Sequence, residues 1–69
     1  MIRRLLDRLL KRGPTFEARR GPSGQWYVRE LAPNGEIVSV SETYTRRSSA
    51  VRAARTRAGG AINGRWRVA

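Results

Sequence analysis

Most ionisable side chains in this sequence are guanidiniums. The 69 residues include 15 Lys and Arg, with Lys11 the single lysine, against 5 Asp and Glu, and they contain neither His nor Cys. Without His or Cys, no Ser-His-Asp or Cys-His catalytic set can be assembled, and no Cys/His cluster can hold a structural metal. No glycine-rich phosphate loop stands between a predicted strand and a helix. We therefore expect a protein that is not an enzyme, with no catalytic residue, no metal site and no cofactor.

Four glutamates remain as candidates for acid–base chemistry, because paired carboxylates can act as general acid and base. They are Glu17, Glu30, Glu36 and Glu42. All four fall among predicted strands and turns, and the arginines outnumber them. Surface ion pairs are therefore the role that we expect for these glutamates.

The arginines are concentrated towards the two ends of the chain. The net charge is +10, yet residues 13–44 hold more acids than bases, whereas residues 45–69 carry seven arginines and no acid. A guanidinium matches phosphate geometry through two parallel N–H donors, and a polyanion would be attracted to such ends. The residues that we expect to contact nucleic acid, either DNA or RNA, are Arg46, Arg47, Arg52, Arg55, Arg57, Arg65, Trp66 and Arg67.

Three of these candidates also have a purely structural interpretation. Arg52 and Arg57 could be solvated residues on the helix face, and Trp66 shares a predicted strand face with Val68, which favours the core over stacking on an unpaired base. Because the central segment is close to neutral, we expect contacts to the phosphate backbone, with little sequence preference and strong salt dependence. The competing hypothesis is a protein-interaction or structural module without nucleic-acid affinity, whose charge serves solubility or an acidic protein partner.

The first element expected to position these groups is an amphipathic helix over residues 2–12, ended by Gly13-Pro14. Its apolar stripe consists of Ile2, Leu5, Leu6, Leu9 and Leu10. A helix this short is not stable alone, so the stripe must dock. An open sheet face or a dimer seam is the favoured place. A groove on another protein and an anionic membrane surface are the alternatives, and a membrane is not the partner that we expect.

After Pro14 the apolar period changes to two, which predicts three strands. They cover residues 16–19, 25–31 and 36–41, with a turn at residues 21–24 and a hairpin at Asn34-Gly35. We expect one core that contains Trp26, Val28, Val38, Val40 and Val51. The opposite sheet face is expected to carry Tyr27, Leu31 and Ile37, which need a cover from the first helix or a second chain.

A second helix is predicted over residues 46–58, with Thr45 as its N-cap and Gly59-Gly60 at its end. Its side towards the sheet is lined by Val51, Ala54 and Ala58, with Ala50 nearby. Small side chains of this kind allow a close approach to the sheet. In the tail, Trp66 and Val68 alternate with arginines as in a short strand, which predicts an edge strand there.

Residues 16–58 also carry a series of motifs. Phe16-Glu17 opens the first strand, Gln25-Trp26-Tyr27-Val28-Arg29 forms the second, Asn34-Gly35-Glu36 forms the hairpin, and Ser41-Glu42-x-Tyr44-Thr45 precedes Ser49-Ala50. This series resembles the YegP-like family of small uncharacterised prokaryotic proteins. The resemblance implies a three-stranded antiparallel sheet packed on one helix, a unit that often occurs in tandem pairs, and it implies no reaction. Glu30 stands where the family has an apolar residue. Because a buried unpaired glutamate would be costly, we expect a bulge, an arginine partner or an exposed strand end there.

These elements predict one α+β domain: an amphipathic helix over residues 1–13, a β-β-β-α module over 14–58, and a basic tail with a short strand over 59–69. A domain of this length buries only a small core, and no cysteine is present to staple it, so we expect a homodimer. No apolar run approaches the ~18 residues of a membrane span, and the N-terminus lacks the pattern of a secretory signal. A cytoplasmic protein is the simplest expectation.

Overall fold

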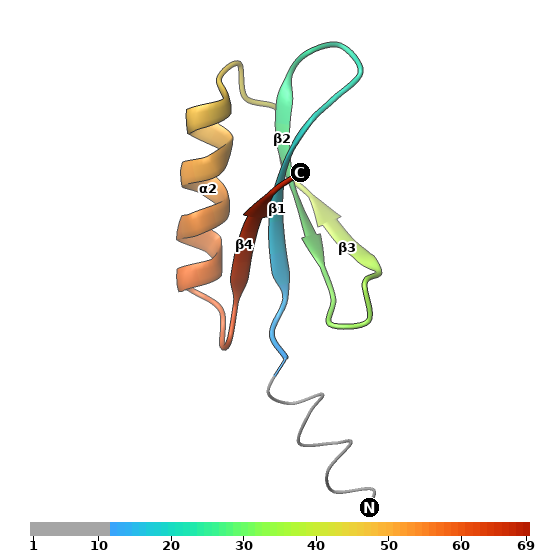
Figure 1. Cartoon of the computed structure of the whole chain (residues 1–69), viewed down its shortest axis with the longest axis vertical. Helices are drawn as coiled ribbons and strands as arrows, with labels where there is room; N and C mark the ends of the chain where they lie inside the picture. Colours follow the sequence, from blue (N-terminus) through green and yellow to red (C-terminus); the bar gives the residue numbers. More distant parts are fainter. Residues whose placement is uncertain (1–11) are drawn as a thin grey trace, which may run out of the picture.

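The computed structural model describes residues 12–69 as four strands and one helix (Figure 1). The elements are β1 (Thr15–Arg20), β2 (Trp26–Leu31), β3 (Ile37–Val40), α2 (Arg47–Gly59) and β4 (Arg65–Val68). Residues 2–11 of the predicted N-terminal helix, with its stripe of Ile2 and four leucines, lie outside the described residues, and Arg12 is not helical. None of the helices among residues 12–69 is long and apolar enough to cross a membrane.

The first three strands form the antiparallel meander that the sequence predicts. The hairpin between β2 and β3 turns at Asn34-Gly35. Gly35 has a φ of 90°, a conformation that costs glycine little and other residues more. The Asn34 Oδ1 atom accepts a hydrogen bond of 3.1 Å from the amide of Glu36, which closes the turn.

The C-terminal strand corrects the prediction of a three-stranded antiparallel sheet. The short strand itself is confirmed, but β4 pairs in parallel with β1 and makes a mixed sheet in the order β3-β2-β1-β4. The amide of Arg65 donates to the carbonyl of Pro14 at 2.9 Å, where the pairing begins. Just before it, Gly64 runs against the end of α2, and a Cβ atom there would overlap the carbonyl oxygen of Ala58. A residue without a side chain is therefore required where the chain enters β4.

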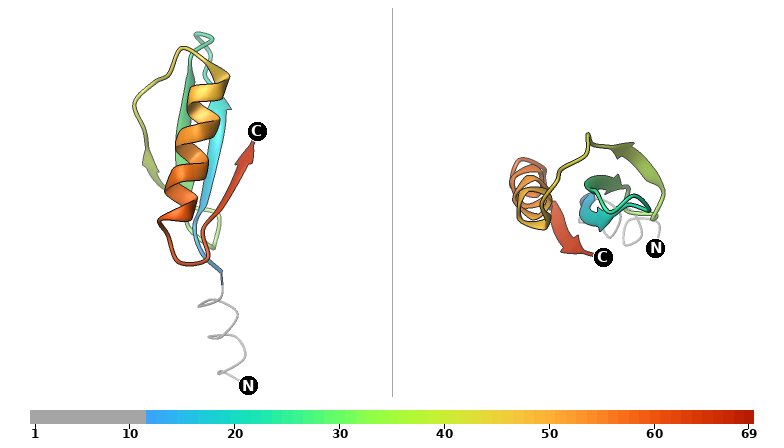
Figure 2. Two further views of the ribbon diagram at one scale, coloured as in Figure 1. Left: turned by 90° about the vertical axis from the view of Figure 1, so that its left-hand side faces the viewer. Right: turned by 90° about the horizontal axis from the view of Figure 1, so that it is seen from above.

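The core lies between α2 and one face of the sheet (Figure 2). The helix buries a stripe of alanines against the strands, namely Ala50, Ala54 and Ala58, and the strands contribute Phe16, Ala18 and Val28. The predicted alanine face is confirmed, and Trp26 and Val51 pack at the margin of this core. Methyl-sized side chains let the helix approach β1, β4 and β2, as close-packed interiors require.

The helix begins one residue later than predicted, and its N-cap is Arg46 rather than Thr45. Arg46 makes no side-chain capping hydrogen bond. A guanidinium has donors only, so it cannot accept from the free amides of the first turn. The other end agrees better with the prediction, because Gly60 is the C-cap.

The prediction that Val38 and Val40 belong to the core is wrong, since both are more than half exposed. The helix does not reach β3, which lies at the far side of the sheet in Figure 2. The register also shifts between Glu30 and Leu31, because Ile37 pairs with Leu31 and Ser39 pairs with Glu30. One extra residue in β3 moves the following side chains to the other face.

The same bulge explains how Glu30 is accommodated. Its backbone pairs with Ser39, and the Ser39 hydroxyl donates to Glu30 Oε1 at 3.3 Å. The Glu30 side chain is half-buried. The expected conflict of a buried unpaired glutamate therefore does not arise.

Candidate anion-binding surfaces

The candidate arginines lie on two different sides of the sheet. In α2 and at its N-cap, Arg46, Arg47, Arg52, Arg55 and Arg57 are all exposed. In β4, Arg65 pairs with Thr15 and Arg67 with Glu17. Neighbouring strand residues point to opposite faces, so these two arginines project from the face that α2 does not cover. The structure thus divides the candidates into an α2 surface, made of the five arginines at positions 46–57, and an open sheet face.

On the α2 surface, two arginines lie over the two tryptophans. The Arg47 guanidinium carbon is 6.0 Å from the centroid of the Trp26 ring, and that of Arg55 is 5.6 Å from the Trp66 ring. These distances are typical of cation–π contacts. The two contacts hold both guanidiniums near the surface of the domain. The α2 surface therefore has arginines outermost and aromatic rings beneath them.

Trp66 is not the core residue that the strand pattern favours. It lies on the same side of the sheet as α2, but its side chain is 45% exposed. The reason is that β4 is an edge strand with a neighbour only on its β1 side. Trp66 therefore has Arg55 above it and solvent beyond the edge, which leaves part of the ring accessible.

A shallow hollow of about 500 Å³ adjoins the α2 surface. It is lined by Tyr44, Ser49, Arg52, Ala53, Thr56 and Arg57. The two guanidiniums and the neighbouring hydroxyls are donors of the kind that phosphate oxygens accept. This hollow places the donors of Arg52 and Arg57 on a common surface.

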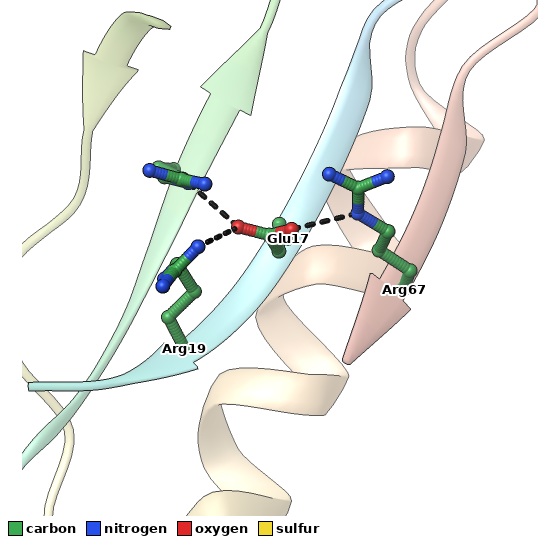
Figure 3. A network of polar contacts seen from close by, with 4 residues as sticks. Glu17, Arg19 and Arg67 are labelled. Carbon is green, nitrogen blue, oxygen red and sulfur yellow. Dashed lines mark hydrogen bonds and ion pairs between the residues drawn. The ribbon is translucent and has the colours of Figure 1, made fainter. Parts of the chain in front are cut away.

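The open sheet face is organised around one buried carboxylate, Glu17 (Figure 3). Its Oε1 atom accepts from Arg29 Nε at 2.6 Å and from Arg19 Nη1 at 3.1 Å, and its Oε2 atom accepts from Arg67 Nε at 2.7 Å. Glu17 is 2% exposed although it faces away from α2. The guanidiniums themselves remain partly exposed, at 22% for Arg29, 38% for Arg19 and 56% for Arg67. We call Glu17 and these three arginines the Glu17 hub.

Two opposing effects act on the pKa of Glu17. Burial raises the pKa, because it disfavours the charged form. The hydrogen bonds from Arg67, Arg29 and Arg19 lower it by more, so that the pKa lies below the ordinary value for glutamate. The carboxylate is therefore ionised at neutral pH, and the hub as a whole carries two positive charges.

The sequence predicted an ion pair for Glu17 but not its burial, and it did not single out Arg19 or Arg29. The alternation of Phe16, Glu17 and Ala18 could have placed Glu17 opposite the helix face. Nothing in the local pattern could have placed Arg67 beside it. That contact depends on the parallel pairing of β4 with β1, which brings together residues fifty positions apart.

The model of a family described as a domain of unknown function (DUF1508) matches residues 22–56. The chain belongs to this family. YegP-like proteins are among its members, so the resemblance in the motifs is confirmed. The match runs from the turn before β2 into α2, and it leaves β1 and β4 outside. The DUF1508 match therefore includes Arg29 and most of the α2 surface but neither Glu17 nor Arg67. No curated protein and no solved structure matches the chain.

Proposed function

We propose that this DUF1508 chain is a small basic binding module that contacts the phosphate backbone of nucleic acid through the α2 surface. The observation that supports the proposal is the set of five exposed arginines at positions 46–57 in a stretch without an acid. Arg47 and Arg57 are ten residues apart, or about 15 Å along a helix. One strand of DNA carries about four phosphates over that length.

The arrangement favours backbone contact over base reading. The guanidiniums of Arg47 and Arg55 lie over the tryptophan rings, so a ligand that approaches from the side of α2 meets charge before it meets these aromatic faces. Phosphate contacts set orientation but carry no sequence information. We therefore expect little sequence preference, and DNA and RNA to be bound alike.

The test is a fluorescence-anisotropy titration of a labelled 20-nucleotide duplex at 50 and 200 mM NaCl. Four phosphate contacts give a slope of about −3.6 for log K against log salt, and therefore roughly 150-fold weaker binding at the higher salt. The variant Arg52→Gln/Arg57→Gln removes two contacts, so its slope should be smaller by about 1.8.

The matched control is Arg52→Lys/Arg57→Lys, which keeps the charge and removes only the guanidinium fork. It should retain most of the salt dependence. Absence of binding at 50 mM NaCl, or binding that salt does not weaken, would contradict the proposal. An acidic protein partner would then become the leading hypothesis for the α2 surface.

A second candidate function is homodimerisation through β3. This edge strand exposes Ile37, Val38 and Val40, and an unpaired edge with apolar side chains is a template for strand pairing. Residues 30–45 contain no lysine or arginine. In a chain of net charge +10, two copies repel each other least at this edge.

Light scattering during size-exclusion chromatography tests this second candidate. The native chain is expected to elute as a dimer, and Val38→Lys should shift it to a monomer because the charge lies at the paired edge. Asn34→Lys is the control with the same added charge in the exposed turn, and it should remain dimeric. A native chain that is monomeric up to millimolar concentration rules out dimerisation through β3.

A further inference from the structure

The open sheet face has features of a second anion site, separate from the α2 surface. Arg29 and Arg67 each use only Nε to bind Glu17. A guanidinium has five N–H donors, so both terminal amino groups of each side chain remain without a hydrogen-bond partner among residues 12–69. The Glu17 hub therefore holds several donors in place while it compensates only one of three positive charges.

A hollow of about 240 Å³ adjoins the hub. Its lining contains Arg12, Arg65 and Arg67 and no acid, together with Thr15 and Leu31. Thr15 pairs with Leu31 on one side and with Arg65 on the other, so these side chains share one row across the sheet. Glu17 lies two residues further along β1, a spacing of about 7 Å. Arg67 belongs both to the hub and to the hollow.

We propose that this hollow binds a phosphate or diphosphate group, with Arg65, Arg67 and Arg12 as its donors. A carboxylate carries one charge, and the single carboxylate already present leaves the hub with two uncompensated positive charges. A phosphate group brings up to two charges and several acceptor oxygens, which suits convergent guanidiniums. The volume is below the ~300–1,000 Å³ of pockets that enclose a whole drug-sized ligand. The hollow therefore accepts the phosphate end of a ligand and leaves the rest of it outside.

The hub gives this site a rigid side. Glu17 is buried, and its bonds to Arg67 and Arg29 are short, so part of the side-chain entropy of both arginines is already lost before a ligand arrives. A site whose donors are already ordered binds its ligand more tightly, because less side-chain entropy is lost on binding. Arg65 is exposed and completes the site from β4.

The experiment is an NMR titration of the ¹⁵N-labelled full chain with sodium pyrophosphate, against sodium chloride of equal ionic strength. Saturable shifts are expected at the amides of Thr15, Leu31 and Arg65, and only with pyrophosphate. Arg65→Gln should weaken pyrophosphate binding about tenfold, because one charge-assisted hydrogen bond is lost. Arg65 makes no side-chain hydrogen bond to residues 12–69, so this variant should fold normally.

Arg20→Gln is the matched control, since Arg20 is exposed and lies outside both the hollow and the α2 surface. It should bind pyrophosphate as the native chain does. Equal affinities of Arg65→Gln and the native chain, or shifts that chloride reproduces, would overturn the proposal. These outcomes do not depend on the α2 surface, so failure of one proposal leaves the other standing.

A second titration identifies where the phosphate comes from. If Arg65→Gln also weakens binding of the 20-nucleotide duplex, the ligand is a backbone phosphate, and the two surfaces contact one polyanion. If duplex affinity is unchanged while pyrophosphate affinity falls, the ligand is a small phosphate-bearing molecule. Both results support the phosphate site and assign its ligand.

Discussion

The Glu17 hub makes the strongest prediction about stability. Glu17→Gln keeps the shape of the side chain but removes its charge. One carboxamide oxygen can replace one carboxylate oxygen as an acceptor, but the amide NH₂ group must then face a guanidinium donor. Three guanidiniums would then surround a neutral group and repel one another. The variant should therefore fold less stably than the native chain at pH 7.

The size of the effect follows from how exposed each pair is. Arg29 is 22% exposed. The contribution of its bond with Glu17 to the free energy of unfolding is therefore near the lower end of the ~1.5–3 kcal/mol that charge-assisted hydrogen bonds provide. Arg19 and Arg67 are more exposed, so each contributes about 0.5 kcal/mol, as surface pairs do. With one acceptor retained in glutamine, the net loss is about 2 kcal/mol. This is a large share of the ~3–5 kcal/mol that a small core supplies.

The assay is urea unfolding at a fixed protein concentration, followed by the fluorescence of Trp26 and Trp66. In thermal unfolding, the same loss of about 2 kcal/mol corresponds to a melting temperature roughly 8–16 °C lower for a domain of this size. Glu30→Gln is the control, because within residues 12–69 Glu30 accepts only the 3.3 Å bond from Ser39, and it should cost less than ~0.5 kcal/mol. If the two variants unfold at the same urea concentration, the assigned role of Glu17 is refuted.

Three further predictions concern pH, the entry to β4 and the core. The folded-state pKa of Glu17 is lowered. The contribution of Glu17 to the free energy of unfolding is therefore complete above the unfolded pKa of ~4.3 and is lost as pH falls through the folded pKa. Acid titration should show the stabilities of the native chain and Glu17→Gln converging, and parallel curves would argue against this role of Glu17. Gly64→Ala should detach β4, because its Cβ would overlap the Ala58 carbonyl, and amide exchange of residues 65–68 should become fast while that of β2 stays slow; unchanged protection in β4 would contradict this. Val28→Ala should cost about 1.5–3 kcal/mol in urea unfolding, because Val28 is the largest fully buried side chain among residues 12–69. Ile62→Ala, at a side chain that is 87% exposed, should be nearly neutral, and equal costs would contradict the placement of Val28 in the core.

Local patterns predicted the elements but not how they meet. The meander, the turn at Asn34-Gly35 and the alanine face of α2 follow from periodicity and turn chemistry, which act over a few residues. The place of Val40 did not, because a single extra residue in β3 reverses its face, and nothing in the residue types marks that bulge. Its exposure also depends on the reach of α2, which is a property of packing and not of sequence period.

The candidate site shows the same division between local and non-local causes. The excess of arginines over acids in residues 45–69 identified the exposed arginines of α2. In a helix without an acid, the arginine side chains lie on the surface. The count treated Arg65 and Arg67 as part of the same charged region, whereas the parallel register of β4 turns them to the opposite side. The neutrality of the β1–β3 segment was therefore misleading. The open sheet face is basic because Arg65 and Arg67 of β4 join Arg19 and Arg29 there, against the single carboxylate of Glu17.

β4 thus connects the two surfaces through the alternation of its side chains. Trp66 faces the α2 side, where Arg55 lies over its ring, and Arg67 on the next position faces Glu17. Parallel pairing with β1 is what allows both contacts at once, since β1 contributes Phe16 to the core and Glu17 to the open face. A polyanion that binds Arg55 and a phosphate that binds Arg67 therefore act on β4 through Trp66 and Arg67, which are neighbours in this edge strand. The docking of β4 therefore positions the donors of the phosphate site and one arginine of the α2 surface.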